Sequence, residues 1–266
     1  MLSLSIQGAR AVDEVVGIVS APSRRDKQKH LGPSEIGEVC DRCLSDRIRG
    51  AYKDEREGAP LAPLIGTAFH ALAEQRLKES PAGRAGSLLI EHRVKVADME
   101  GYGEIIGTVD VFDTVTGDVM DWKVLSKARI AALSRCIHAR LDGTVLLDRT
   151  SKFWETAWKY YVQMMLYCYG LSRDGYEVRR ANLLMLPRDA TTDVLPGSLR
   201  TITFPYRPQA AEATLARFSE ILDRVHGGDE PEAFESSDGC YTCSRRKREE
   251  KNNLAMLELW GPRPAG

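Results

Sequence analysis

Two carboxylates and a lysine are the residues of this sequence best suited to chemistry. Asp110 ends the run Gly-Thr-Val-Asp, and Asp121 and Lys123 flank a tryptophan in Asp-Trp-Lys. Carboxylate oxygens are the ligands that Mg²⁺ and Mn²⁺ prefer, and a neighbouring ammonium can position an attacking water or help to deprotonate it. These residues therefore predict a metal-assisted hydrolytic site. Because Asp-x-Lys is a common tripeptide, a solvated strand edge is the alternative.

Two predicted strands hold these groups side by side. Residues 102–114 and 118–125 are short apolar runs, and the turn signal Thr-Gly-Asp at 116–118 separates them. A tight antiparallel hairpin about this turn sets Asp110 opposite Asp121. Like charges opposite each other destabilise a sheet, so the pairing favours a cation between the two carboxylates.

Helices and further strands are predicted on both sides of the hairpin. Helical patterns cover residues 63–79, 153–170 and 208–225, and strand patterns cover residues 88–97, 177–187 and 201–206. A further helix is expected after a Ser34 cap, residues 81–87 are expected to form a loop, and residues 126–148 a mobile arm over the site.

Several polar side chains on these elements are candidates for the same site. His70 and Glu74 lie one turn apart on the first long helix, and Gln163 and Tyr167 lie four residues apart on the second. For His70, a satisfied core residue on an apolar helix is the alternative. The expected buried stripe of the first of these helices is Leu64, Phe69, Leu72, Ala73 and Leu77. Glu91 is another carboxylate on a predicted strand, but an exposed charge is the expected reading.

Length and charge limit the classes of function. A chain of 266 residues with 43% hydrophobic residues can bury one substantial core with an accessory lobe. Its formal net charge of −1 gives no global basic field, so nucleic-acid binding would depend on local patches. No apolar run approaches a membrane span and the first residues lack the pattern of a secretory signal, so we expect a cytoplasmic protein. The expected organisation is a lead-in at 1–30, a single domain at 31–250 with its core at about 60–226 and a cysteine lobe from 31–60 plus 227–250, and a tail at 251–266.

Two Cys-x-x-Cys pairs near the ends of this domain predict one shared metal site. The pairs are Cys40 with Cys43 and Cys240 with Cys243. In a reducing compartment, four cysteines so arranged are typical of a tetrathiolate site that binds zinc or an iron–sulfur cluster. Such a site would clip the first helix to the end of the domain. Cys136 and Cys168 are expected to be inert buried thiols.

Clustered cations are the candidates for contacts with a nucleic-acid backbone. They are Lys127 and Arg129 after the hairpin, and Arg245, Arg246 and Arg248 after the last cysteine. A near-neutral chain that binds DNA must depend on such local clusters.

Four motifs in order along the chain resemble those of the PD-(D/E)XK nucleases, and more narrowly those of their RecB-like branch. The motifs are His70, Gly107-x-x-Asp110, Asp121-x-Lys123 and Gln163-x-x-x-Tyr167, and the resemblance covers about residues 31–250. The flanking cysteines are similar to those of the AddB-type and Cas-four-type iron–sulfur exonucleases and their phage relatives. In those families one early and three late cysteines hold a 4Fe–4S cluster, whereas this chain has two and two. The resemblance thus implies a 4Fe–4S cluster, with Zn²⁺ as the alternative.

The resemblance also implies a fold and an activity. The fold would be a restriction-endonuclease-like α/β core with a central mixed sheet flanked by helices, with its terminal segments clipped by the four-cysteine site. The activity would be that of a Mg²⁺- or Mn²⁺-dependent deoxyribonuclease, an exonuclease acting on single-stranded DNA or duplex ends. The alternatives are an accessory nuclease with a protein partner in CRISPR adaptation or recombination, and a non-catalytic DNA-binding module that retains the fold.

Particular residues take roles from the same resemblance. His70, Asp110 and Asp121 would bind the divalent cation, together with the Val124 carbonyl. Lys123 would be the catalytic lysine. Gln163 and Tyr167 would orient the DNA or the lysine near the scissile phosphate.

Overall fold

The computed structural model describes residues 30–50, 61–139, 145–189, 200–238 and 240–248. The tail predicted at 251–266 lies outside these residues, as does all but the last residue of the lead-in predicted at 1–30. Within the described ranges, no helix is both long and apolar enough to cross a membrane.

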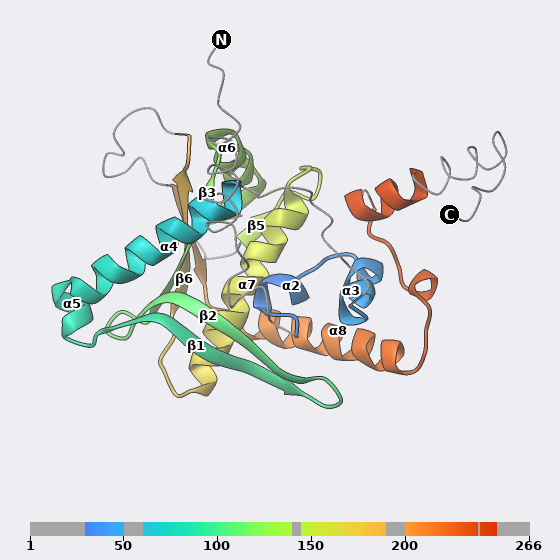
Figure 1. Cartoon of the computed structure of the whole chain (residues 1–266), viewed down its shortest axis with the longest axis horizontal. Coiled ribbons are helices and arrows are strands. Elements are labelled where there is room, and N and C mark those ends of the chain that lie inside the picture. The colour runs from blue at the N-terminus through green and yellow to red at the C-terminus, as the bar shows by residue number, and fades with distance from the viewer. Residues whose placement is uncertain (1–29, 51–60, 140–144, 190–199, 239, 249–266) are drawn as a thin grey trace, which may run out of the picture.

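A five-stranded mixed sheet forms the centre of the fold (Figure 1). In spatial order its strands are β1 (Leu88–Met99), β2 (Gly103–Asp113), β3 (Asp118–Leu125), β6 (Arg180–Pro187) and β7 (Arg200–Pro205). β3 and β6 are parallel, and the other neighbours are antiparallel. The five strands predicted from the sequence are therefore confirmed, with small shifts of their ends, as is the α/β class with a central mixed sheet.

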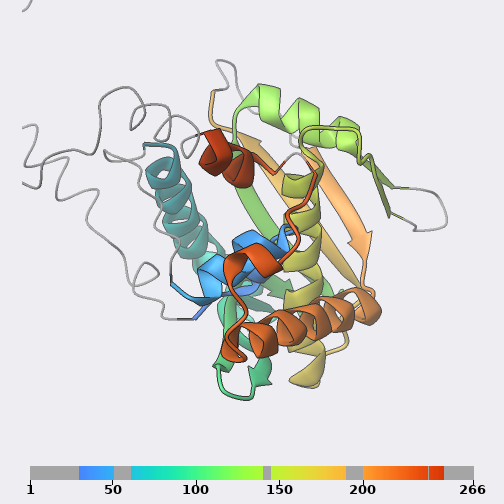
Figure 2. The same cartoon turned by 90° about the vertical axis from the view of Figure 1, so that its right-hand side faces the viewer.

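Helices flank the sheet. They are α2 (Pro33–Ile36), α3 (Asp41–Ile48), α4 (Leu61–Glu79), α5 (Pro81–Arg84), α6 (Lys127–Cys136), α7 (Trp154–Arg173), α8 (Pro208–His226), the 3-10 helix η2 (Pro231–Ala233) and a helix over residues 241–248. α4 contacts the sheet face that carries Trp122, whose ring centroid lies 6.0 Å from that of Phe69. α7 lies on the face that carries Lys123, whose Nζ lies 5.5 Å from the ring centroid of Tyr160. Figures 1 and 2 show strands of the sheet between these two helices.

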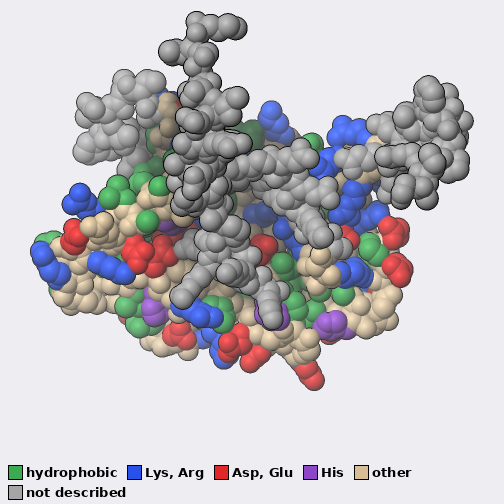
Figure 3. Space-filling model, viewed as in Figure 1, with side chains coloured by type: hydrophobic (Ala, Val, Ile, Leu, Met, Phe, Trp, Pro, Cys, Tyr) green, Lys and Arg blue, Asp and Glu red, His purple; other side chains and the backbone are tan. Residues whose placement is uncertain are grey.

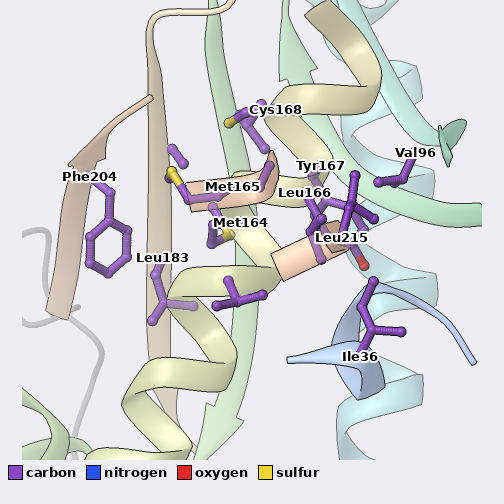
Figure 4. Packing of buried hydrophobic residues seen from close by; sticks show 14 of the residues in the cluster. Ile36, Val96, Met164, Met165, Leu166, Tyr167, Cys168, Leu183, Phe204 and Leu215 are labelled. Atoms are coloured by element: carbon purple, nitrogen blue, oxygen red, sulfur yellow. The ribbon is translucent and has the colours of Figure 1, made fainter. Parts of the chain in front are cut away.

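The hydrophobic core lies between the sheet and α7 (Figure 4). Met164, Met165 and Leu166 of α7 are fully buried, together with Leu183 of β6 and Phe204 of β7. The second half of α7 is buried around most of its circumference because both the sheet and α8 pack against it. The strands that carry the candidate site therefore rest on a rigid, well-packed layer.

Two predictions about local structure near the start of the domain are wrong. Ser34 caps no helix: Gly32 is the N-cap of the short α2, and a second helix, α3, begins after Cys40. In the expected buried stripe of α4, Leu72 is 54% exposed, because α4 packs against the sheet with one side only.

Two segments predicted as irregular contain regular structure. Residues 81–87 hold α5, whose N-cap Ser80 accepts a hydrogen bond from the Gly83 N–H. Residues 126–148 hold α6 and a small hairpin of β4 (Ile137–Ala139) and β5 (Val145–Leu147). α6 is packed on the core rather than a mobile arm, since its Leu133 is fully buried there.

The four-cysteine group joins both ends of the described chain, as predicted. The cysteine lobe, made of α3, η2 and residues 235–238 and 240–248, lies beside α8. The Arg42 N–H of α3 donates a hydrogen bond to the Glu235 carbonyl at 3.1 Å. Arg246 pairs with the buried Asp46 of α3. The two segments are thus docked on each other directly and through the cysteines.

Candidate active site

Three carboxylates stand in a row across the first three strands. The register of β2 with β3 pairs Val111 with Met120, one residue short of Asp110 and Asp121, and so agrees with the pairing predicted from the turn up to that point. The register of β1 with β2 places Glu91 opposite Asp110. Of the described non-glycine residues, Glu91 alone has a positive φ, 49°. Backbone strain of this kind is concentrated at functional sites, so it marks Glu91 as part of the site.

His70 of α4 faces two of these carboxylates. Its Nδ1 lies 3.1 Å from Asp110 Oδ1 and 3.5 Å from Glu91 Oε1. Nδ1 is buried, and no described residue forms a hydrogen bond of normal geometry with it. Burial lowers the pKa of His70, but the two carboxylates outweigh burial and raise the pKa to about 9. A cation between the nitrogen and the oxygens would complete this arrangement.

The donor atoms fit one small divalent cation. The ligand atoms of His70, Glu91 and Asp110 all lie within 4.8 Å of one another. In an octahedral site with ligands at about 2.1 Å, adjacent ligand atoms are about 3.0 Å apart, close to the two separations from His70 Nδ1. The Trp122 N–H donates to Asp110 Oδ2 at 2.9 Å, which holds that carboxylate in place. Two carboxylates and one imidazole suit Mg²⁺ or Mn²⁺.

Asp121 and Lys123 form an ion pair beside this group. Asp121 Oδ2 lies 2.7 Å from Lys123 Nζ, and the Asp121 side chain is 2% exposed. Burial is the main cause that raises the pKa of Asp121, and the Asp110 charge adds to it, while the Lys123 charge opposes both. The net result is a pKa of about 6. Burial lowers the pKa of Lys123, but Asp121 outweighs burial and holds it above its ordinary value. Lys123 is therefore protonated at neutral pH.

Gln163 and Tyr167 of α7 form a buried polar pair near the lysine. Gln163 Nε2 donates a hydrogen bond to Tyr167 Oη at 2.8 Å. Burial raises the pKa of Tyr167, and the Asp121 charge adds to the effect, so the phenol is neutral. A Cβ at Gly107 would lie 2.6 Å from Tyr167 Cε1 and 2.8 Å from Pro33 Cγ. The glycine of Gly-x-x-Asp thus has a steric role, because it lets the tyrosine ring pack against β2.

The structure adds one carboxylate to the predicted site and separates another from it. Glu91 was expected to be an exposed charge, which is wrong, because its side chain is 16% exposed and faces His70. Glu74 lies outside the site, where its Oε1 pairs with Lys78 Nζ at 2.6 Å. The role of the Val124 carbonyl stays a prediction.

The predicted DNA-contacting cations fall into two groups. Lys127 and Arg129 are exposed in the first turn of α6. Burial raises the pKa of Tyr160, while the charges of Lys123 and Arg129 both lower it. Arg129 is therefore close enough to act electrostatically on Tyr160, whose ring lies beside Lys123. Arg245 and Arg248 are exposed on the helix over residues 241–248, whereas Arg246 is engaged by Asp46.

The sulfur atoms of the cysteine lobe are in mutual contact. Sγ–Sγ distances are 3.6 Å for Cys40–Cys243, 3.6 Å for Cys43–Cys240 and 3.7 Å for Cys43–Cys243. A hydrogen bond from Cys43 lowers the pKa of Cys40 to about 5, and the same bond raises the pKa of Cys43. A cation between the sulfurs would stabilise them as thiolates. Cys136 and Cys168 are buried elsewhere, and burial raises the pKa of each thiol.

Comparison with known proteins gives similarity in structure only. No protein-family model and no curated protein matches the sequence. A putative exonuclease from Eubacterium rectale is similar with a TM-score of 0.46 and 12% identity, over 92% of this chain and 94% of that one. An alkaline exonuclease from Laribacter hongkongensis is similar with a TM-score of 0.42 and 10% identity, over 75% of this chain and 89% of that one. A phage-related exonuclease from Haemophilus somnus 129PT is similar with a TM-score of 0.42 and 12% identity, over 85% and 88% of the two chains. Similarities at this level do not assign a function, which must be argued from the site.

Proposed function

We propose that this chain is a Mg²⁺- or Mn²⁺-dependent DNA exonuclease of the PD-(D/E)XK type, in its RecB-like branch. Its substrates would be single-stranded DNA or duplex ends. The observation that supports this best is the group of His70, Glu91 and Asp110, in which the buried Nδ1 faces both carboxylates without a hydrogen bond of normal geometry, beside the ion pair of Asp121 and Lys123. Clustered carboxylates next to a protonated lysine suit hydrolysis of an anionic ester.

Four side chains would hold the divalent cation. His70, Glu91 and Asp110 are within reach of one ion, and Asp121 lies close enough to Asp110 for the Asp110 charge to raise the Asp121 pKa. We also propose the Val124 carbonyl as a ligand. When bound, the cation supplies a Lewis acid for the phosphate and lowers the pKa of an attacking water.

Lys123 would act on the reacting phosphate. Because it stays protonated beside Asp121, it can donate a hydrogen bond to the attacking water or to a non-bridging phosphate oxygen. Gln163 and the neutral phenol of Tyr167 would orient the lysine and the strand. Water attacks phosphorus, one ester P–O bond breaks, and the products are a phosphate monoester and a free hydroxyl.

Exposed cations near the site would hold the DNA backbone. Lys127 and Arg129 lie in the first turn of α6, and the Arg129 charge acts on Tyr160, the residue beside Lys123. Lys and Arg side chains also gather around the helix over residues 241–248, at the right of Figure 3. Arg245 and Arg248 belong to this helix. We propose that these two groups contact phosphates, and that Arg246 instead stabilises the cysteine lobe through its ion pair with Asp46.

Digestion of end-labelled single- and double-stranded DNA with Mg²⁺, Mn²⁺ or EDTA tests the proposal. Asp110→Asn and Lys123→Met should each slow cleavage at least about 100-fold. Glu104→Gln is a matched control, since Glu104 lies on β2 like Asp110 but is exposed and pairs with Lys95 at 3.1 Å. Near-normal turnover by Asp110→Asn would reject this site.

The same assay separates the alternatives. Cleavage only in the presence of a co-purifying protein would favour an accessory nuclease in recombination or CRISPR adaptation. Metal-independent DNA binding with no cleavage of either substrate would favour a non-catalytic binding module.

A further inference from the structure

We propose that Cys40, Cys43, Cys240 and Cys243 bind a single tetrahedral zinc ion, and not the 4Fe–4S cluster that the resemblance implies. The inference rests on the geometry of the sulfurs and is independent of the proposed nuclease activity.

The sulfur separations match one metal ion. With Zn–S bonds of about 2.3 Å, the sulfurs of a tetrahedral site are about 3.8 Å apart. Three of the separations here are 3.6, 3.6 and 3.7 Å, and all four sulfurs lie within 4.8 Å of one another. In a 4Fe–4S cluster each thiolate binds a different iron at a corner of a cube, so the sulfurs lie roughly 6 Å apart. The cysteine group is too small for the cluster.

Contacts around the group oppose its expansion. To admit a cluster, α3 and the helix over residues 241–248 would have to separate. The hydrogen bond of 3.1 Å from the Arg42 N–H to the Glu235 carbonyl and the pairing of Arg246 with Asp46 hold these segments together. The cysteines are also closed off from solvent, since Cys40 is fully buried and Cys43 is 2% exposed.

The two Cys-x-x-Cys pairs present their sulfurs in equivalent ways. Cys40 is the N-cap of α3, and its carbonyl accepts a hydrogen bond from the Leu44 N–H at 2.9 Å. The Cys240 carbonyl accepts from the Ser244 N–H at 2.9 Å in the same manner, at the start of the last described helix. Each pair thus offers one sulfur before a helix and one in its first turn. Two matched halves of this kind are typical of a structural zinc site.

The surroundings also suit the charge of the complex. One Zn²⁺ with four thiolates carries a net charge of about −2. Both helix N-termini face the sulfurs with the positive ends of their dipoles. Arg246 adds a cation near Cys43 and Cys243, while it is oriented by Asp46. The ion would therefore cross-link the two ends of the domain.

Metal analysis of the full chain tests the zinc site directly. The protein would be expressed in medium supplemented with both iron and zinc and purified without oxygen, so that neither supply nor oxidation decides the result. Zinc, iron and acid-labile sulfide would be measured per chain, with visible absorption. We expect one zinc, no iron, no sulfide and a colourless protein. Replacement by Co²⁺ should give the intense visible and charge-transfer bands of a tetrahedral tetrathiolate complex.

Variants locate the ion within the chain. Cys243→Ser should lose the zinc, whereas Cys136→Ser should keep it, because Cys136 is buried but lies outside the group. If Cys243→Ser does not fold, the analysis of the natural chain still decides. Iron with sulfide would overturn the proposal in favour of the cluster. Iron without sulfide, or a folded chain free of metal, would overturn it as well, and neither result would affect the test of DNA cleavage.

Discussion

Replacing Gly107 by alanine tests whether the site depends on close packing of Tyr167 against β2. The new Cβ would lie 2.6 Å from Tyr167 Cε1 and 2.8 Å from Pro33 Cγ, both well inside contact distance. Tyr167 is 6% exposed and bonded to Gln163, so the ring cannot swing away freely. Overpacking of this kind costs about 1–3 kcal/mol of unfolding free energy. Displacing the phenol from the lysine should also slow cleavage, by up to about 100-fold for a shift of about 1 Å.

Urea denaturation measures the loss of stability, and the end-labelled DNA assay measures the loss of cleavage. The midpoint should fall without a change in the denaturant slope. Gly66→Ala is the matched control: within the described structure no atom lies within 4 Å of its Cβ position, so alanine should be neutral or should stabilise α4 by up to about 1 kcal/mol. In a Tyr167→Leu background, which lacks Cε1, the Gly107→Ala change should cost less. A Gly107→Ala protein with natural stability and cleavage would refute the steric argument.

Three further predictions concern the remaining groups. Glu91→Gln should slow cleavage about as much as Asp110→Asn, because both carboxylates face His70 Nδ1, and the initial rate of DNA digestion under saturating Mn²⁺ checks this. The pKa of His70 is raised from 6.5 to about 9 on folding, so its protonation stabilises the metal-free protein fully below pH 6.5 and the effect is lost as pH rises through 9. That loss should be about 3 kcal/mol in denaturant titrations with EDTA, and should be absent in His70→Gln. Arg246→Ala should destabilise the protein by about 3 kcal/mol, since it leaves Asp46, with a side chain 4% exposed, unpaired; thermal or urea unfolding should show only about 0.5 kcal/mol or less for the exposed Lys247→Ala.

The hairpin of β2 and β3 could be predicted from the sequence because its information is local. The tight turn with Gly117, at φ 73°, allows only a narrow choice of register, and the apolar alternation of both strands agrees with it. This register brings Asp110 and Asp121 near each other on neighbouring strands, and the strand period of two places Lys123 on the same face as Asp121, where the two side chains form an ion pair. The contribution of His70 depended on the resemblance instead, since periodicity cannot say which helix lies against which strands.

The cysteine lobe shows where local information ends. The paired spacing of the cysteines predicts a shared site, but the size of the site depends on how closely α3 and the helix over residues 241–248 approach each other. That approach is set by contacts such as Arg246 with Asp46, between residues far apart in the chain. From the sequence alone, without these long-range contacts, Arg246 is indistinguishable from the other cations of the basic run. The same contacts separate a structural arginine from its exposed neighbours.

Glu91 is the carboxylate that the sequence offered as a possible further ligand but for which an exposed charge was expected, and a β-bulge helps to explain its actual position. Near the turn, β1 pairs with β2 so that Asp98 is opposite Glu104, and counting back at that register would set Glu91 opposite Val111. A bulge between Lys95 and Ala97 shifts the register by one residue, so Glu91 falls opposite Asp110 instead. Because the side-chain period of a strand is two, this single step moves Glu91 to the other face of the sheet, where its carboxylate reaches His70. The position of this third carboxylate therefore depends on an irregularity that a regular strand pattern cannot reveal. The positive φ of Glu91 itself is a second, separate departure from regular strand geometry.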